Sequence, residues 1–137
     1  MGASGLETAM RDVDREIRVL EDGLRDGKLA LASTVEGALR LANRLMLMFA
    51  KAGDRAIPGL EEDSDPLEVF KVFVKGDPSL NAVRDNLREL VYYRNCLAAG
   101  REDALPVNPV AMAVRTLRHV YLYMRTRAIK EYGLQEK

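Results

Sequence analysis

Apolar residues recur at spacings of three and four along four long stretches of this chain, and nowhere do they alternate with period two over a useful length. A spacing of three and four collects side chains on one face of a helix, whereas a half-buried strand needs strict alternation. In the first stretch the steps are four, three, four, three and four: Leu6, Met10, Val13, Ile17, Leu20 and Leu24. The sequence therefore predicts an all-α fold, an antiparallel up-down bundle of four long helices plus one short helix.

Glycine, proline and capping residues divide the chain into these helices. The first helix is predicted to end near Arg25, and the second to run from Lys28 to Lys51. The second helix is apolar over more than half of its circumference, which is typical of a helix at the centre of a bundle or at a subunit contact. Three further helix starts carry an N-cap residue followed by proline at the first helical position: Asp65–Pro66, Asp77–Pro78 and Asn108–Pro109. Gly133 is expected to end the last helix.

The length of 137 residues predicts a single helical domain, residues 1–137, because a chain of this size forms one compact core. No apolar run approaches the roughly 20 residues needed to cross a bilayer, and the N-terminus lacks an export signal. Cys96 is the only cysteine, which excludes an intramolecular disulfide and a cysteine-based metal site. We therefore expect a cytoplasmic protein without a membrane partner, a metal or a cofactor.

Basic residues gather in the C-terminal part of the chain, although the formal net charge is zero. From residue 109 onward, six basic residues are accompanied by two acidic ones. A neutral chain argues against general polyanion binding, but a basic helix can contact phosphates or dock on the acidic middle of the chain. Arg115 and Arg118 are therefore candidate RNA contacts.

Arg94 interrupts the apolar face of the third long helix, the one that follows Asp77–Pro78. It follows Leu90 by four positions, where the pattern calls for an aliphatic residue. An arginine cannot lose its charge and is costly to bury alone, so Arg94 needs a carboxylate or a phosphate as its partner. Asn95 adds two donors and an acceptor beside this charge.

The segment from residue 94 to 100 resembles the R-N-x-L-A-H-G signature of HEPN domains, a family of helical nucleotide-binding domains. Five positions match: Arg94, Asn95, Leu97, Ala98 and Gly100. Ala99 stands where the family has histidine. The resemblance covers this motif and the helical topology of the chain.

In active members, the resemblance implies metal-independent RNA cleavage at a site assembled from two copies of the domain. The arginine holds the scissile phosphate and the histidine moves protons, roles that suit a permanent planar cation and an imidazole. Carried over by position, the candidate catalytic residues are Arg94, Asn95 and the vacant position Ala99. The candidate RNA-binding residues are Arg94, Arg101, Arg115 and Arg118.

The missing histidine predicts a chain with little or no nuclease activity, because general acid–base assistance is worth roughly 10²- to 10⁴-fold in rate. Ala99 is either natural, in a domain that binds RNA, a nucleotide or a protein, or it was introduced to silence a toxic ribonuclease. The expected partners are a second copy of the chain, RNA, and a cognate antitoxin or nucleotidyltransferase-like protein of a prokaryotic defence system.

A structural interpretation of the same residues remains open. Arg94 then bridges to Asp85, Glu89 or an acid of another helix, and the chain is a non-catalytic helical adaptor that binds a protein partner. His119, the only histidine, is interpreted as a partly exposed structural residue in preference to a substitute base. The acidic run 61–63 is interpreted as a solvated turn, and Asn43 as an amide bonded to a neighbouring helix.

Overall fold

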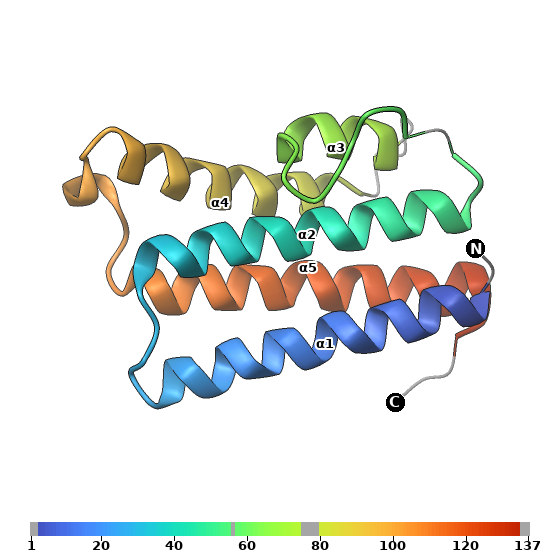
Figure 1. Cartoon of the computed structure of the whole chain (residues 1–137), viewed down its shortest axis with the longest axis horizontal. Coiled ribbons are helices and arrows are strands. Elements are labelled where there is room, and N and C mark those ends of the chain that lie inside the picture. Colours follow the sequence, from blue (N-terminus) through green and yellow to red (C-terminus); the bar gives the residue numbers. More distant parts are fainter. Residues whose placement is uncertain (1–2, 56, 75–79, 135–137) are drawn as a thin grey trace.

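The computed structural model describes residues 3–55, 57–74 and 80–134. These residues form five α-helices and one short 3₁₀ helix, and no β-strand occurs among them, which confirms the predicted all-α class. The helices are α1 (Ala3–Arg25), α2 (Leu31–Ala52), α3 (Pro66–Val74), α4 (Asn81–Ala98), η2 (Glu102–Ala104) and α5 (Pro109–Tyr132) (Figure 1).

Two helices, α2 and α5, form the centre of the molecule. They pack against each other, and α1 and α4 each pack against both of them from opposite sides (Figure 1). In the same view α1 and α4 run in one direction and α2 and α5 in the other, while α3 covers part of α2 and α4. Thirteen of the 22 residues of α2 are buried, so its wide apolar face serves the core of this chain.

The apolar residues of α1 are also used within the chain. Four of them are at most 1% exposed: Leu6, Met10, Val13 and Ile17. They belong to the hydrophobic core, and α1 packs against both α2 and α5. Burying such side chains removes apolar surface from water, which is the main favourable contribution to folding.

The expected start of the second helix at Lys28 is wrong, because residues 26–30 form the connection between α1 and α2. Gly27 has a φ of +67°, and the Lys28 amide donates to the Gly23 carbonyl at 2.9 Å, which closes α1. Leu29 then packs on Gly23, where a Cβ atom would come within 2.7 Å of its Cδ2 atom. The connection therefore extends to residue 30, and α2 begins at Leu31.

The other predicted boundaries agree with the structure to within one residue where it describes them. Helix α1 ends at Arg25, α3 begins at Pro66, and α5 begins at Pro109 and ends before Gly133, whose φ is +66°. The predicted start at Asp77–Pro78 lies outside the described residues. Among the helices of residues 3–55, 57–74 and 80–134, none combines the length and apolar character needed to span a membrane.

Candidate functional site

Arg94 lies in the last turns of α4, where its half-buried side chain lines a small cleft against α2 and the loop before α3. The cleft has a volume of about 60 Å³ and is lined by Glu36, Leu39, Arg40, Asn43, Glu62, Asp63, Ser64, Pro66 and Arg94. Within the described part of the chain, the Arg94 side chain forms no hydrogen bond or ion pair. No described carboxylate is therefore ion-paired with it, although Glu36, Glu62 and Asp63 line the same cleft.

The carboxylates that were considered as partners of Arg94 lie elsewhere. Asp85 is 3.8 Å from the Arg84 guanidinium. The Glu89 carboxylate accepts a hydrogen bond from the Thr116 hydroxyl at 2.8 Å, which links α4 to α5. Neither acid accounts for the presence of an arginine at position 94.

The rest of the motif forms the end of α4. Gly100 has a φ of +68°, its amide donates to the Leu97 carbonyl at 3.2 Å, and the Arg101 amide donates to the Cys96 carbonyl at 2.8 Å. This pair of bonds is the usual way in which a helix ends at a glycine in the left-handed region. The match at Gly100 is thus explained by helix termination, whereas the matches at Arg94 and Asn95 are not.

Position 99 projects from the exposed end of the same helix. Ala99 and Asn95 are both exposed, and residues four apart lie on one face of a helix. A longer side chain at position 99 would therefore extend into solvent beside Asn95.

Arg101 follows this helix end and is paired within its own loop. Its guanidinium donates from Nε to Asp103 Oδ1 and from Nη2 to Asp103 Oδ2, both at 3.0 Å. This hydrogen-bonded pair lowers the pKa of the Asp103 carboxyl. Both side chains are exposed, so a phosphate could replace the carboxylate at little cost.

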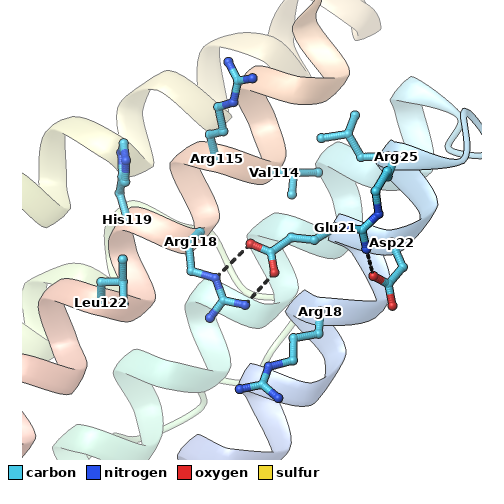
Figure 2. A pocket seen from close by; sticks show the side chains of 10 residues that line it. Arg18, Glu21, Asp22, Arg25, Val114, Arg115, Arg118, His119 and Leu122 are labelled. Atoms are coloured by element: carbon cyan, nitrogen blue, oxygen red, sulfur yellow. Dashed lines mark hydrogen bonds and ion pairs between the residues drawn. The ribbon is translucent and has the colours of Figure 1, made fainter. Parts of the chain in front are cut away.

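The other two candidate RNA-binding residues, Arg115 and Arg118, lie in a groove between α1 and α5 (Figure 2). The groove has a volume of about 570 Å³, and its apolar lining includes Val114 and Leu122. His119 is exposed and lines the same groove, not the Arg94 cleft. The four predicted RNA-binding arginines are thus not gathered in one cleft.

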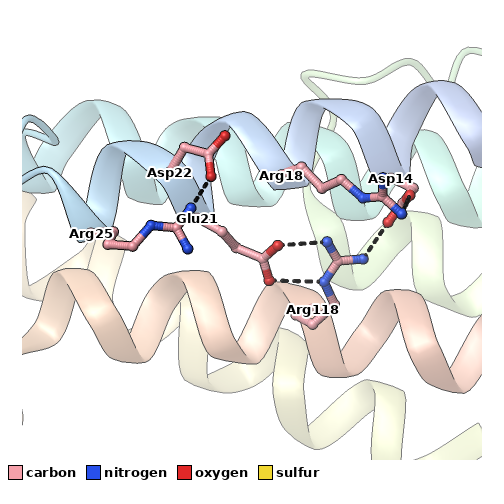
Figure 3. Close-up of polar contacts among 6 residues, drawn as sticks. All are labelled: Asp14, Arg18, Glu21, Asp22, Arg25 and Arg118. Atoms are coloured by element: carbon pink, nitrogen blue, oxygen red, sulfur yellow. Dashed lines mark hydrogen bonds and ion pairs between the residues drawn. The ribbon is translucent and has the colours of Figure 1, made fainter.

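Arg118 is neutralised inside the fold. Its Nε and Nη2 atoms donate to the two Glu21 carboxylate oxygens at 3.0 and 2.8 Å, and Nη1 donates to Asp14 Oδ1 at 2.6 Å (Figure 3). The hydrogen bond with Arg118 lowers the pKa of Glu21, and the pKa of Arg118 is raised in turn. The guanidinium also lies over the Tyr121 ring, 5.2 Å from its centroid. A phosphate at Arg118 would have to displace two carboxylates.

The sequence allowed Glu21 to pair with a base on another helix, but it did not identify Arg118, because Glu21 and Asp14 are 97 and 104 residues away from it. One signal was present in α1, where Asp14 and Glu21 are seven residues apart and so lie on one edge of the buried face. Such a pair of acids beside an apolar face indicates a cation on the facing helix.

The expected partner of Asn43 is also wrong. Its side chain is 1% exposed and its Nδ2 atom donates to the main-chain carbonyls of Glu62 and Ser64, at 2.9 and 2.8 Å, in the loop before α3 and not in a helix. Arg44 is paired with the Glu62 carboxylate at 3.1 Å and with Glu16 of α1. The acidic turn is thus fixed to α2 and is not simply a solvated segment.

Across the described residues, no group of three or more histidine, cysteine, aspartate or glutamate side chains is placed to hold a metal ion. Comparisons of the chain with protein-family models, with curated proteins and with solved structures find no match.

Proposed function

We propose that this chain is a HEPN-type RNA-binding domain, related to endoribonucleases but without the group that transfers protons. The proposal is supported chiefly by Arg94, a half-buried guanidinium that is ion-paired with no carboxylate of the described residues. Asn95 follows it on the exposed end of α4. The helix directions and contacts are compatible with the antiparallel up-down bundle expected of such a domain.

The chemistry expected at Arg94 is capture of a backbone phosphate. The guanidinium presents parallel N–H donors whose spacing matches two oxygens of a phosphate group. The cleft is small, about 60 Å³, and none of the described side chains that line it is an aromatic ring on which a base could stack. Arg94 would therefore read the backbone of RNA and not its bases.

The methyl group of Ala99 offers no proton to a reacting ribose, so the chain is expected to bind RNA without cutting it.

A composite site requires two copies, each contributing Arg94 and position 99. A cognate antitoxin or a nucleotidyltransferase-like protein is the further partner expected in a defence system. Light scattering on a sizing column tests the pairing, since a monomer mass at all concentrations contradicts a composite site.

The decisive experiment compares RNA binding and cleavage by the chain and by Ala99→His. The given chain should bind single-stranded RNA and leave it intact, whereas Ala99→His should cleave at least about 10²-fold faster. Arg94→Ala should abolish both binding and the restored cleavage. Arg88→Ala, which removes an exposed arginine from the same helix, is the matched control and should change neither. If Ala99→His neither cuts nor binds RNA, the proposal is wrong.

A second candidate function is a helical adaptor that binds a protein partner. It is favoured by a groove between α1 and α2 in which Val19 is 66% exposed. Beside it, a Cβ atom on Gly37 would have no neighbour within 4 Å, so this glycine is not required by packing within the described chain. Failure to bind RNA at any salt concentration, together with a stable protein partner that Val19→Glu releases, would favour this function.

A further inference from the structure

The loop before α3 contains a preformed acidic turn, Glu61–Ser64. The Ser64 amide donates to the Glu61 carbonyl at 3.1 Å, and the Ser64 hydroxyl accepts from the Glu61 amide at 2.8 Å. The turn is fastened to α2 by the two hydrogen bonds of Asn43 and by the pair between Arg44 and Glu62. The turn is therefore held against α2 through two of its main-chain carbonyls and through the Glu62 carboxylate.

This turn supplies part of the wall of the Arg94 cleft. Glu62 and Asp63 line it together with Glu36, and they face two cations, Arg40 and Arg94. With Glu62 paired to Arg44, the carboxylates Glu36 and Asp63 face the two guanidiniums, so the cleft has no net positive charge and its affinity for an anion is lowered. Of the two acids in the turn, Glu62 is paired with Arg44, whereas Asp63 is exposed and has no ion pair in the described chain.

The fastening of the turn is incomplete. The Oδ1 atom of Asn43 is buried and has no hydrogen-bond partner in the described part of the structure, although its Nδ2 atom makes two bonds. A buried amide oxygen without a partner is unfavourable.

We infer that the Glu61–Ser64 turn is a built-in competitor of phosphate at Arg94, with Asp63 as the charge that a bound phosphate opposes. The inference rests on the proposed function of Arg94 and concerns the regulation of that same site. In the position that the structure shows, the Asp63 charge lowers the affinity of Arg94 for RNA. A phosphate must either bind against the Asp63 charge or move the turn away from α2.

The test replaces Asp63 by its neutral isostere in the full chain and measures two probes, a single-stranded RNA oligonucleotide and inorganic phosphate. Asp63→Asn should tighten RNA binding about three- to tenfold at low salt, as expected for removing one charge near a phosphate in a medium close to water. Phosphate binding, followed by NMR at the Arg94 side chain, should tighten in the same direction. Asp63 is exposed, so the variant is expected to fold.

Glu61→Gln is the matched control, because Glu61 is an exposed acid of the same turn that does not line the Arg94 cleft. It should change RNA affinity much less than Asp63→Asn does. The double variant Asp63→Asn with Arg94→Ala should lose the gain entirely. Equal gains in Asp63→Asn and Glu61→Gln, or a gain that survives loss of Arg94, would overturn the inference.

The two probes separate the inference from the proposed function. If Asp63→Asn strengthens phosphate binding at Arg94 while no variant binds RNA, the turn competes as inferred and the RNA function is wrong. If RNA binds through Arg94 equally well with Asp63 and with asparagine at that position, the function stands and the inference is wrong. If neither probe binds any variant, both are wrong.

Discussion

Arg118 and Arg94 are both half-buried arginines in long helices, but the fold treats their charges in opposite ways. Arg118 on α5 has three donor atoms engaged by Glu21 and Asp14 of α1. The Arg94 side chain on α4 has no ion pair within the described residues. An arginine whose charge is matched inside the chain stabilises helix packing, whereas an unmatched one is available to an anion from outside.

The difference arises from the facing helix. Opposite Arg118, α1 presents acids two turns apart on one edge, and both reach the same guanidinium. Around Arg94, the acids Glu36, Glu62 and Asp63 line the cleft without reaching an ion-pairing distance. Geometry therefore separates Arg118, a structural arginine, from Arg94, a candidate ligand-binding one, although both are half-buried.

The largest expected effect is a difference in the free energy of unfolding between variants that lack the Arg118 charge and variants that lack the Arg94 charge. Arg118→Met should lower the free energy of unfolding by about 1–2 kcal/mol, because it leaves Glu21 without its partner and Asp14 with Arg18 alone at a packed helix interface. Arg94→Met should change it by less than about 1 kcal/mol, since no intramolecular bond of the described residues is lost. Urea unfolding followed by circular dichroism measures both values.

Arg18→Met serves as the control for this pair. Arg18 is paired with Asp14 at 3.0 Å, but its side chain is 72% exposed, so its removal should cost at most about 1 kcal/mol. If Arg94→Met destabilises the chain as much as Arg118→Met, Arg94 is a structural residue and the contrast disappears.

The sequence alone predicted the ends of most helices, but it could not predict the difference between Arg118 and Arg94. Helix ends were predictable because their causes are local: proline at the start of α5 and a left-handed glycine after its end lie within a few residues of the boundary. The start of α2 was not, because the left-handed conformation of Gly27 and the contact of Leu29 with Gly23, which extend the connection to residue 30, leave no signal in the apolar periodicity. Periodicity identified Arg94 as out of place, but it could not tell which helix faces it or whether that helix carries an acid within reach.

A smaller effect is expected from pH. Because Glu21 has a lowered pKa in the folded chain, chiefly through its hydrogen bond with Arg118, the unfolded chain binds more protons between the folded pKa and the ordinary value of 4.5. Stability from this pair is therefore fully present above about pH 4.5 and is lost as pH falls through the folded pKa. At pH 7 Glu21→Gln should cost about 1 kcal/mol or less, since the carboxylate is partly exposed and screened.

Urea unfolding of the original chain and of Glu21→Gln across the range from pH 7 to pH 3 tests this expectation. The difference between the two proteins should shrink toward low pH and also with added salt. A difference that grows toward low pH would mean that the carboxyl is stabilised in its protonated form, contrary to the Arg118 geometry.

The smallest effect is expected at Arg101, which is ion-paired like Arg118 but is a candidate RNA contact like Arg94. Its two bonds to Asp103 have good geometry, as at Arg118, but both side chains are exposed, so the pair competes with water and should add little to stability. Asp103→Asn should leave Tm unchanged within the error of a thermal melt. If Arg101 contacts RNA, the same variant should strengthen RNA binding, because it removes the internal competitor. A lowered Tm would show that the exposed Arg101–Asp103 pair stabilises the fold as the Arg118 pair does. Exposure to solvent would then not separate structural arginines from RNA-binding ones.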